Sequence, residues 1–138
     1  MRLEIVNPES LGAPRGWNHG VVAPAGGRLL FVAVMAGWNA DAPGEPPGFV
    51  AQFSRALDQV LEVVREAGGS PTDVARMTVY VTDLAEYRTA LKALGGAWRE
   101  RFGRHYPAMA LLEVKGLVDR GAKVEIEATA VLAGSPRS

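Results

Sequence analysis

The chain has 138 residues, the usual length of one compact domain, and we expect a single domain over residues 1–138. Its 48% hydrophobic and 22% charged residues are typical of a folded globular protein, and its 16 glycines and 9 prolines indicate many turns. Lysine and arginine number 15, as do aspartate and glutamate, which argues against the broad positive surface of nucleic-acid-binding and membrane-surface proteins.

The N-terminal part of the chain predicts three strands and a loop. Residues 3–8 predict a short edge strand that ends in an Asn-Pro turn, since proline cannot donate a hydrogen bond to a sheet. Two apolar runs follow at residues 17–23 and 28–35, and residues 24–27 between them have the Pro/Gly composition of a hairpin connection. Residues 39–48, rich in proline and glycine, are expected to form a loop.

The middle of the chain predicts a helix followed by a strand. Apolar side chains recur every three or four residues over residues 49–67, which is typical of an amphipathic helix. Gly68 and Gly69 follow where a helix commonly ends. Residues 74–82 alternate between apolar and polar side chains, which predicts a strand with one buried face.

A second amphipathic helix is predicted to follow this strand. Asp83 stands three residues before Glu86, the spacing of an N-terminal cap, and apolar residues then recur at helical spacing as far as Trp98. Gly95 and Gly96 should each weaken the middle of this helix by ~1 kcal/mol relative to alanine.

Two strands complete the predicted fold, at residues 108–114 and 123–132, joined by a turn through residues 119–121. The order β-β-β-α-β-α-β-β predicts an α+β protein with a six-stranded mixed sheet and two helices on one face. Two helices can cover only one face of such a sheet. Because both faces of the strand at residues 28–35 are apolar, we expect a symmetric partner to bury the other face and the chain to form a homo-oligomer.

The strongest local pattern lies in the two C-terminal strands. The Pro-Ala start and Glu-Val end of residues 106–114, with Val-Glu-Ile-Glu-Ala at residues 124–128, resemble the C-terminal signature of the RidA/YjgF enamine/imine deaminase family. The resemblance covers nearly the whole chain, because three upstream segments also resemble family segments in the same order: Met35-Ala36-Gly37, Ala67-Gly68-Gly69 and residues 77–84.

The resemblance implies a chorismate-mutase-like homotrimer with three sites at the subunit interfaces, where the open sheet faces form a shared barrel. In that family an enamine tautomerises to an imine, and water attacks the imine carbon to release ammonia and a ketoacid. Such a reaction needs only a carboxylate that orients water, backbone carbonyls that hold it, and a cation that grips the substrate. The expected partners are therefore other copies of the chain and a small imine or enamine.

The resemblance also assigns candidate site residues. Glu125 falls at the position of the water-orienting glutamate, which makes it the predicted catalytic residue. From the strand pattern alone, Glu125 would be a solvated carboxylate paired with Lys123 or Arg120. The residues expected to hold the water through their carbonyl groups are Ala110 and Leu111, and those expected to shape the pocket are Trp17, Gly37, Leu91 and Met109.

Met109 departs from the family pattern, because it stands where the deaminases carry the arginine that grips the substrate carboxylate. Loss of a charge-assisted bidentate contact should weaken substrate binding by about 2 to 5 kcal/mol, which argues against a simple 2-iminoacid as substrate. Ala36 replaces a family serine, and Leu91 and Trp17 make the pocket more apolar. Either the chain kept only the scaffold, or it was selected for a neutral or aromatic ligand, so a non-catalytic ligand-binding or regulatory trimer is the alternative function.

Two further features have both a functional and a structural interpretation. Because histidine as a residue type can act as an acid or a base near neutral pH, His19 is a further acid/base candidate, or else a partly exposed strand residue. Arg99, Arg101, Arg104 and His105 form a basic cluster that complements the dipole of the second helix. The same cluster could contact RNA, since some relatives are described as endoribonucleases or translation inhibitors, but the neutral net charge argues against this.

Several classes of chemistry find no pattern in the sequence. The chain has no cysteine, and its two histidines are far apart with no compact carboxylate group, so we expect no metal site and no cofactor. No apolar run approaches the ~20 residues that span a bilayer, and the first residues lack the apolar core of a signal peptide. We therefore expect a cytoplasmic protein.

Overall fold

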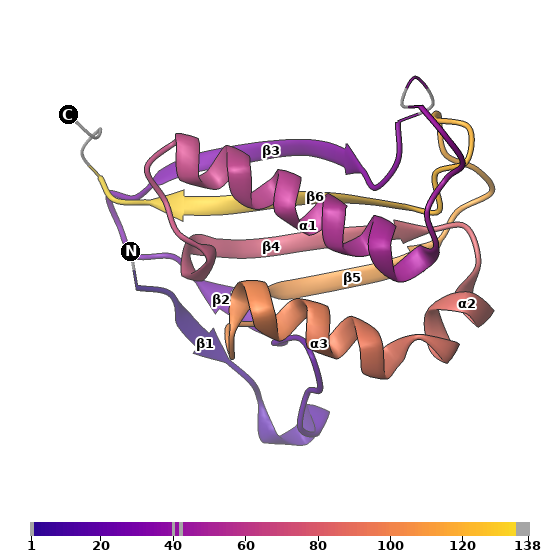
Figure 1. Cartoon of the computed structure of the whole chain (residues 1–138). Helices are drawn as coiled ribbons and strands as arrows, with labels where there is room; N and C mark the ends of the chain where they lie inside the picture. Colours follow the sequence, from indigo (N-terminus) through magenta and orange to yellow (C-terminus); the bar gives the residue numbers. More distant parts are fainter. Residues whose placement is uncertain (1, 40, 42, 135–138) are drawn as a thin grey trace.

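The computed structural model describes residues 2–39, 41 and 43–134 of the chain (Figure 1). Its centre is a four-stranded mixed sheet in which β4 and β5 are parallel and the other neighbours are antiparallel. The strands, in their spatial order, are β3 (Arg28–Ala36), β6 (Val124–Leu132), β4 (Val74–Val81) and β5 (Ala108–Glu113).

The six-stranded sheet predicted from the sequence is corrected to four strands plus a separate pair. The strands β1 (Glu4–Val6) and β2 (Gly20–Val22) form a two-stranded antiparallel sheet, and the hairpin predicted between residues 17–23 and 28–35 is wrong. Asn18, just before β2, bridges to Ala108 at the start of β5, so the small sheet lies beside β5 while β3 forms the opposite edge.

The segment between β2 and β3 therefore crosses the ends of the intervening strands (Figure 1). The six Cα–Cα steps from Val22 to Arg28 can span about 21 Å when extended, which is sufficient because the four strand spacings from β2 to β3 amount to about 19 Å. A Cβ added at Gly134, beyond β6, would lie 2.6 Å from the carbonyl oxygen of Gly26, which puts the crossing segment against the end of β6. The Pro/Gly composition indicated a turn correctly but could not say which strand comes next to which.

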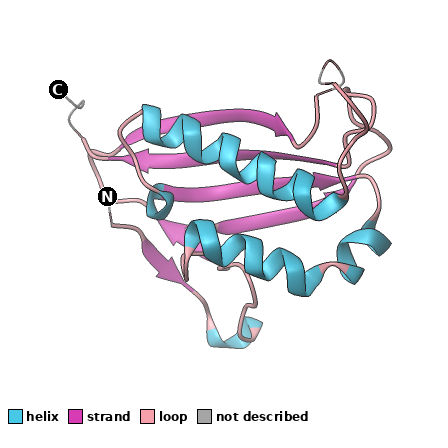
Figure 2. Cartoon of the chain, in the orientation of Figure 1, coloured by secondary structure: helices cyan, strands magenta, loops and turns pink. Residues whose placement is uncertain are grey.

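The helices lie on one face of the sheet, as predicted (Figure 2). Helix α1 (Phe49–Glu66) crosses β3 and β6, and α3 (Leu91–Phe102) runs alongside it over the β5 side. Asp83 caps the short helix α2 (Leu84–Thr89) by accepting hydrogen bonds from two backbone amides. Two 3-10 turns, Glu9–Leu11 and Pro71–Asp73, complete the described elements.

The second predicted helix is divided in two at Ala90, and Gly95 and Gly96 lie inside its second part, α3. The amide of Ala90 donates to the carbonyl groups of both Glu86 and Tyr87, which is a tightened helical turn. The Thr89 hydroxyl donates to a carbonyl one turn earlier at 2.9 Å, a contact that bends helices. The division gives α3 its own direction along β5.

The core lies between the sheet and the two long helices. Along β6 every second side chain from Val124 to Ala130 is buried, and Met77 and Val79 of β4 are completely buried beside them. The intervening side chains point to the other face, which no element of residues 2–39, 41 and 43–134 covers as α1 and α3 cover the first. Large apolar side chains remain in water there, with Phe31 74% and Leu29 60% exposed.

Candidate functional site

A cavity of about 510 Å³ lies between β5 and α3. Four of the side chains predicted to form the site line it: Trp17, Leu91, Met109 and Leu111. The remaining lining residues come from the loop before β2, from α1 to α3 and from the sheet: Arg15, Gly16, Phe53, Val79, Tyr87, Leu94, Gly95, Trp98, Arg99 and Tyr106. The cavity is therefore mainly apolar and aromatic.

The pairing of β5 with β4 explains why two predicted residues face this cavity. Met109 lies opposite Met77 and Leu111 opposite Val79, and directly paired residues project from the same face of a sheet. Met77 and Val79 are completely buried under the helices, so Met109 and Leu111 point toward the helices as well. Both are only partly buried because α3 lies over β5 with the cavity between them.

Glu125 projects from the opposite face of the sheet. It pairs with Tyr80 of β4 and Ala36 of β3, while its neighbours Val124 and Ile126 are buried under the helices. Side chains alternate between the two faces of a strand, so the Glu125 carboxylate points away from the helices. Within one chain the predicted catalytic carboxylate therefore does not meet the cavity that contains Met109.

The Glu125 carboxylate is half-buried and forms no hydrogen bond or ion pair with the described part of the chain. Burial raises its pKa above the ordinary value for glutamate, and the negative charge of Asp119 raises the pKa further. By contrast Glu127, two residues later on the same face, accepts a hydrogen bond of 2.5 Å from the Tyr80 hydroxyl. Glu125 is thus the carboxylate of this strand that holds no partner.

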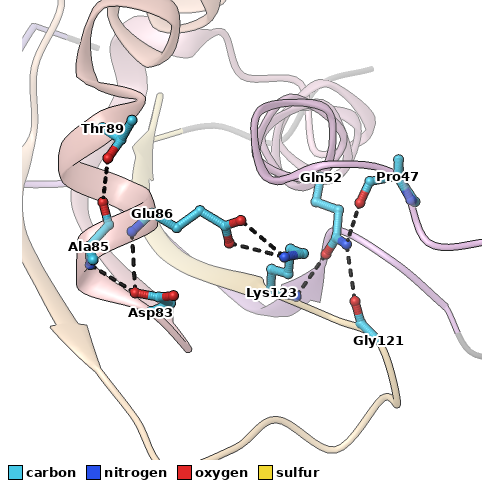
Figure 3. A network of polar contacts seen from close by, with 8 residues as sticks. All are labelled: Pro47, Gln52, Asp83, Ala85, Glu86, Thr89, Gly121 and Lys123. Atoms are coloured by element: carbon cyan, nitrogen blue, oxygen red, sulfur yellow. Dashed lines mark hydrogen bonds and ion pairs between the residues drawn. The ribbon is translucent and has the colours of Figure 1, made fainter.

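The alternative interpretation of Glu125 named Lys123 or Arg120 as its partner, and that pairing is not formed. Lys123 instead holds both carboxylate oxygens of Glu86 on α2 at 3.1 Å (Figure 3). Arg120 has no ion pair within the residues that the structure describes.

The buried side-chain amide of Gln52 holds the start of β6, the strand that carries Glu125 (Figure 3). The Gln52 side chain, completely buried on α1, donates to the carbonyls of Pro47 and Gly121 at 3.0 Å each. Its own oxygen accepts the backbone amide of Lys123 at 2.8 Å. Because the bonds with Gly121 and Lys123 tie the start of β6 to α1, the backbone next to Glu125 is held in place by the core.

Gly37 and Ala110 lie outside the cavity lining. Gly37 is buried against α1, where an added Cβ would lie 2.3 Å from the carbonyl oxygen of Gln52, so close helix packing accounts for glycine there. Ala110 pairs with Thr78 and shares the open face with Glu127. It lies on β5, whose outer edge forms only the single bridge through Asn18 among the described residues, so the nearby carbonyl groups have no strand partner there.

His19 lies at the β1–β2 sheet and does not line the cavity. Its backbone amide donates to the Asn7 side chain at 2.7 Å, which helps to tie β2 to β1. Its Nδ1 atom is buried and has no hydrogen-bond partner in the described chain. The structure does not bring His19 together with Glu125 or with Met109.

The basic cluster at the end of α3 divides into separate environments. Arg101 is paired with Asp58 of α1 at 2.6 Å, and that bond raises the pKa of the guanidinium. The His105 ring nitrogen Nε2 lies 2.7 Å from the Val74 carbonyl oxygen. Arg99 alone of the cluster lines the cavity. Sequence reasoning missed this role, although Arg99 stands four residues after Gly95 and eight after Leu91 on one helical stripe.

Neither a metal-binding cluster nor a membrane-spanning helix is found within residues 2–39, 41 and 43–134. No group of three or more histidine, aspartate or glutamate side chains gathers there as metal ligands would. No helix in that part of the chain combines the length and apolarity needed to cross a membrane.

Comparison with known proteins gives consistent matches over most of the chain. The family model described as Endoribonuclease L-PSP matches residues 8–132. The 2-iminobutanoate/2-iminopropanoate deaminase of Capra hircus is 33% identical over 106 residues, which cover 75% of this chain and 73% of that protein.

Solved structures with the same fold include two proteins of bacterial origin. YyfB from Yersinia pestis, a protein of unknown function of the conserved Rid protein family, is 31% identical with a TM-score of 0.80, covering 96% of this chain and all of that one. TdcF from E. coli, solved with bound serine, is 27% identical with a TM-score of 0.65, covering 88% of this chain and 92% of that one.

Proposed function

The chain belongs to the RidA/YjgF family, and from this membership we propose that it is a hydrolytic deaminase of reactive enamine and imine metabolites. We propose further that it works as a homotrimer, with each site in a cleft between two subunits. The observation that carries the proposal is the unpaired Glu125 carboxylate on the uncovered face of the sheet, opposite to the face with the cavity.

The opposite placement of Glu125 and Met109 requires a second copy of the chain. In a closed symmetric assembly, the open face of one subunit meets another subunit, and Glu125 then faces the cavity of its neighbour. The exposed Phe31 and Leu29 on the open face supply apolar surface for that contact. This arrangement brings together a carboxylate and a pocket that a single chain keeps apart.

Glu125 is suited to move protons in the proposed reaction. Water attacks the imine carbon, the π electrons of the C=N bond pass to nitrogen, and Glu125 accepts the proton that the water loses. Glu125 returns this proton to the nitrogen, and the resulting carbinolamine collapses to a carbonyl compound and ammonia. The raised pKa of Glu125 favours both steps. A carboxyl group whose pKa lies closer to neutral pH is a better base for the water and still releases the proton to the nitrogen.

The cavity residues define what the substrate can be. Trp17, Leu91 and Met109 provide an apolar pocket, and Met109 offers no bidentate contact to a carboxylate beside the imine carbon. A simple 2-iminoacid is therefore not the proposed substrate, whereas an imine with an apolar or aromatic body fits the lining. The carbonyls of Ala110 and Leu111 are proposed to hold the water, and Gly37, whose amide donates to the Val124 carbonyl, is proposed to shape the site beside Glu125.

A non-catalytic trimer that binds a small ligand is the second candidate, and the apolar lining around Met109 favours it. The two candidates differ in what happens to an imine in the cavity. A binder holds a stable apolar ligand without releasing ammonia, while a deaminase consumes imines. RNA cleavage ranks below both, because Arg101 of the basic cluster is bound to Asp58 and the Nε2 atom of His105 lies against the Val74 carbonyl oxygen.

Ammonia release from a panel of freshly generated imines, both acidic and neutral, tests the proposal. Glu125→Gln should lower turnover by about 100-fold or more, since a positioned acid/base group contributes that much. Glu127→Gln is the matched control, because it changes the next carboxylate on the same face and glutamine can still accept from Tyr80. If wild type and Glu125→Gln release ammonia equally slowly from every substrate, the deaminase proposal is wrong and the binding alternative stands.

A further inference from the structure

Among the described residues that line the cavity between β5 and α3, all the charged side chains are positive. Its described lining includes two guanidinium groups, Arg15 from the loop before β2 and Arg99 from α3, and no aspartate or glutamate. The other lining residues are apolar or aromatic side chains and two glycines. Both arginines are exposed, and such a pocket favours an anionic ligand because no carboxylate of the described lining competes for their guanidinium groups.

Arg99 lies along the cavity side of α3, above a glycine. A Cβ added at Gly95 would lie 3.2 Å from Nη1 of Arg99, closer than side chains normally approach. The backbone of Gly95 does not have the positive φ that would demand glycine. The glycine therefore leaves room for the Arg99 guanidinium to lie back over the preceding helical turn, on the side of α3 that lines the cavity.

The Arg99 guanidinium is free to bind a ligand. It forms no hydrogen bond or ion pair with any other described residue, and the backbone of Arg99 takes part in the hydrogen bonds of α3 and of its C-terminal end at Gly103. Arg101, two positions later, shows the contrast: its guanidinium holds Asp58 through Nε at 2.6 Å and Nη2 at 3.2 Å. One arginine of this helix joins α3 to α1, and the other faces the cavity with its donors unused.

We propose that Arg99, on the helix side of the cavity, binds the anionic group of the substrate and thereby determines substrate specificity. Met109, on the strand side, has no charge with which to bind an anion. This inference rests on the proposed deaminase function and names its substrate class. The substrate is an imine or enamine with an apolar or aromatic body and a carboxylate directed at α3, where a guanidinium can bind both oxygens.

The walls of the cavity fit the body of such a molecule. Trp98 is fixed by a hydrogen bond from its indole nitrogen to the His105 carbonyl at 3.0 Å, and its ring stacks on Tyr106 at 5.8 Å. Met109 and Leu111 form the strand-side wall. An aromatic ring held between these walls leaves its carboxylate to reach the helix.

Binding of phenylacetate and of neutral phenylacetamide to the assembled full-length protein tests the role of Arg99. Calorimetry should show phenylacetate bound at least about tenfold more tightly than phenylacetamide by wild type, since only the acid forms the charge-assisted contact. Arg99→Gln should remove this preference, and Arg99→Lys should restore part of it. Arg104→Gln, which changes an exposed cation at the end of the same segment but outside the lining, should keep it.

Three results would overturn the inference: no preference in wild type, a preference that survives Arg99→Gln, or one that Arg15→Gln removes while Arg99→Gln does not. Glu125→Gln separates this outcome from that of the proposed function. It should keep at least the wild-type preference for phenylacetate over phenylacetamide, whatever happens to ammonia release, because it leaves Arg99 in place and removes a negative charge that faces the cavity. In the active enzyme, Arg99→Gln should raise KM for an acidic imine at least about tenfold more than for a neutral one.

Discussion

The two faces of the four-stranded sheet come from the same strands but have opposite surroundings. On the face under α1 and α3, Met77, Val79 and Ile126 are completely buried. On the other face, Phe31 and Leu29 remain largely exposed beside the row that holds Glu125 and Glu127. The buried face explains the stability of the single chain. The exposed face has the apolar side chains expected of an assembly surface, and the carboxylate that we propose as catalytic points out of the chain that carries it.

Truncation on the covered face should have the largest effect on stability. Ile126→Ala removes buried methylene groups under the helices and should lower the free energy of unfolding by about 2 to 5 kcal/mol, while Ile126→Val should cost only about 0.5 to 1.5 kcal/mol. Urea unfolding at one fixed protein concentration measures both. An Ile126→Ala protein as stable as wild type would mean that the covered face does not supply the core.

A charge on the open face should act on assembly instead. Phe31→Asp places a carboxylate in the proposed contact and should reduce the mass in solution from three times the chain mass to the 14.7 kDa of one chain. Light scattering measures the mass, and circular dichroism should show unchanged helix and strand content. Val118→Asp, at a residue 98% exposed between β5 and β6, is the control and should leave the assembly intact. Wild-type mass in Phe31→Asp would contradict the role of this face.

Glu125 should impose a small pH dependence on stability. Because its folded-state pKa is raised, the folded chain binds the proton more tightly, so the contribution of Glu125 is most favourable below the ordinary glutamate pKa and is lost as pH rises through the raised value. Glu125→Gln should therefore be more stable than wild type at about pH 7, by a few tenths of a kcal/mol after solvent screening, and equal to it at about pH 3. Equal stability at both pH values would argue against the raised pKa.

The strands and helices that periodicity could predict are those with one buried face. The alternation over residues 74–82 and the stripe over residues 49–67 depend only on burial, and both elements are where they were expected. Pairing depends on the whole chain, so the β2–β3 hairpin suggested by residues 24–27 was wrong. The division at Ala90 was missed because it depends on one hydroxyl–carbonyl contact that no periodic pattern reveals.

The candidate site could be predicted only in part, and for a related reason. The family resemblance pointed to Met109 and Leu91, which line one cavity, and to Glu125, whose role stays a prediction. Arg99 was assigned to the helix dipole and Gly95 to helix weakening, because each was considered alone. Gly95 and Arg99 lie four residues apart on the face of α3 that borders the cavity, where the guanidinium lies over the glycine. The sequence alone does not show this cavity, because it forms only where β5 lies under α3.

Subunit mixing tests most directly whether the two faces complete each other across copies of the chain. Glu125→Gln lacks the carboxylate, and Leu91→Trp fills the cavity at a half-exposed position, so each variant alone should be inactive. Refolded together in equal amounts, they should recover about one quarter of the wild-type ammonia release, since random assembly gives that share of interfaces an intact carboxylate facing an intact cavity. A mixture no more active than its two parents would contradict the shared site.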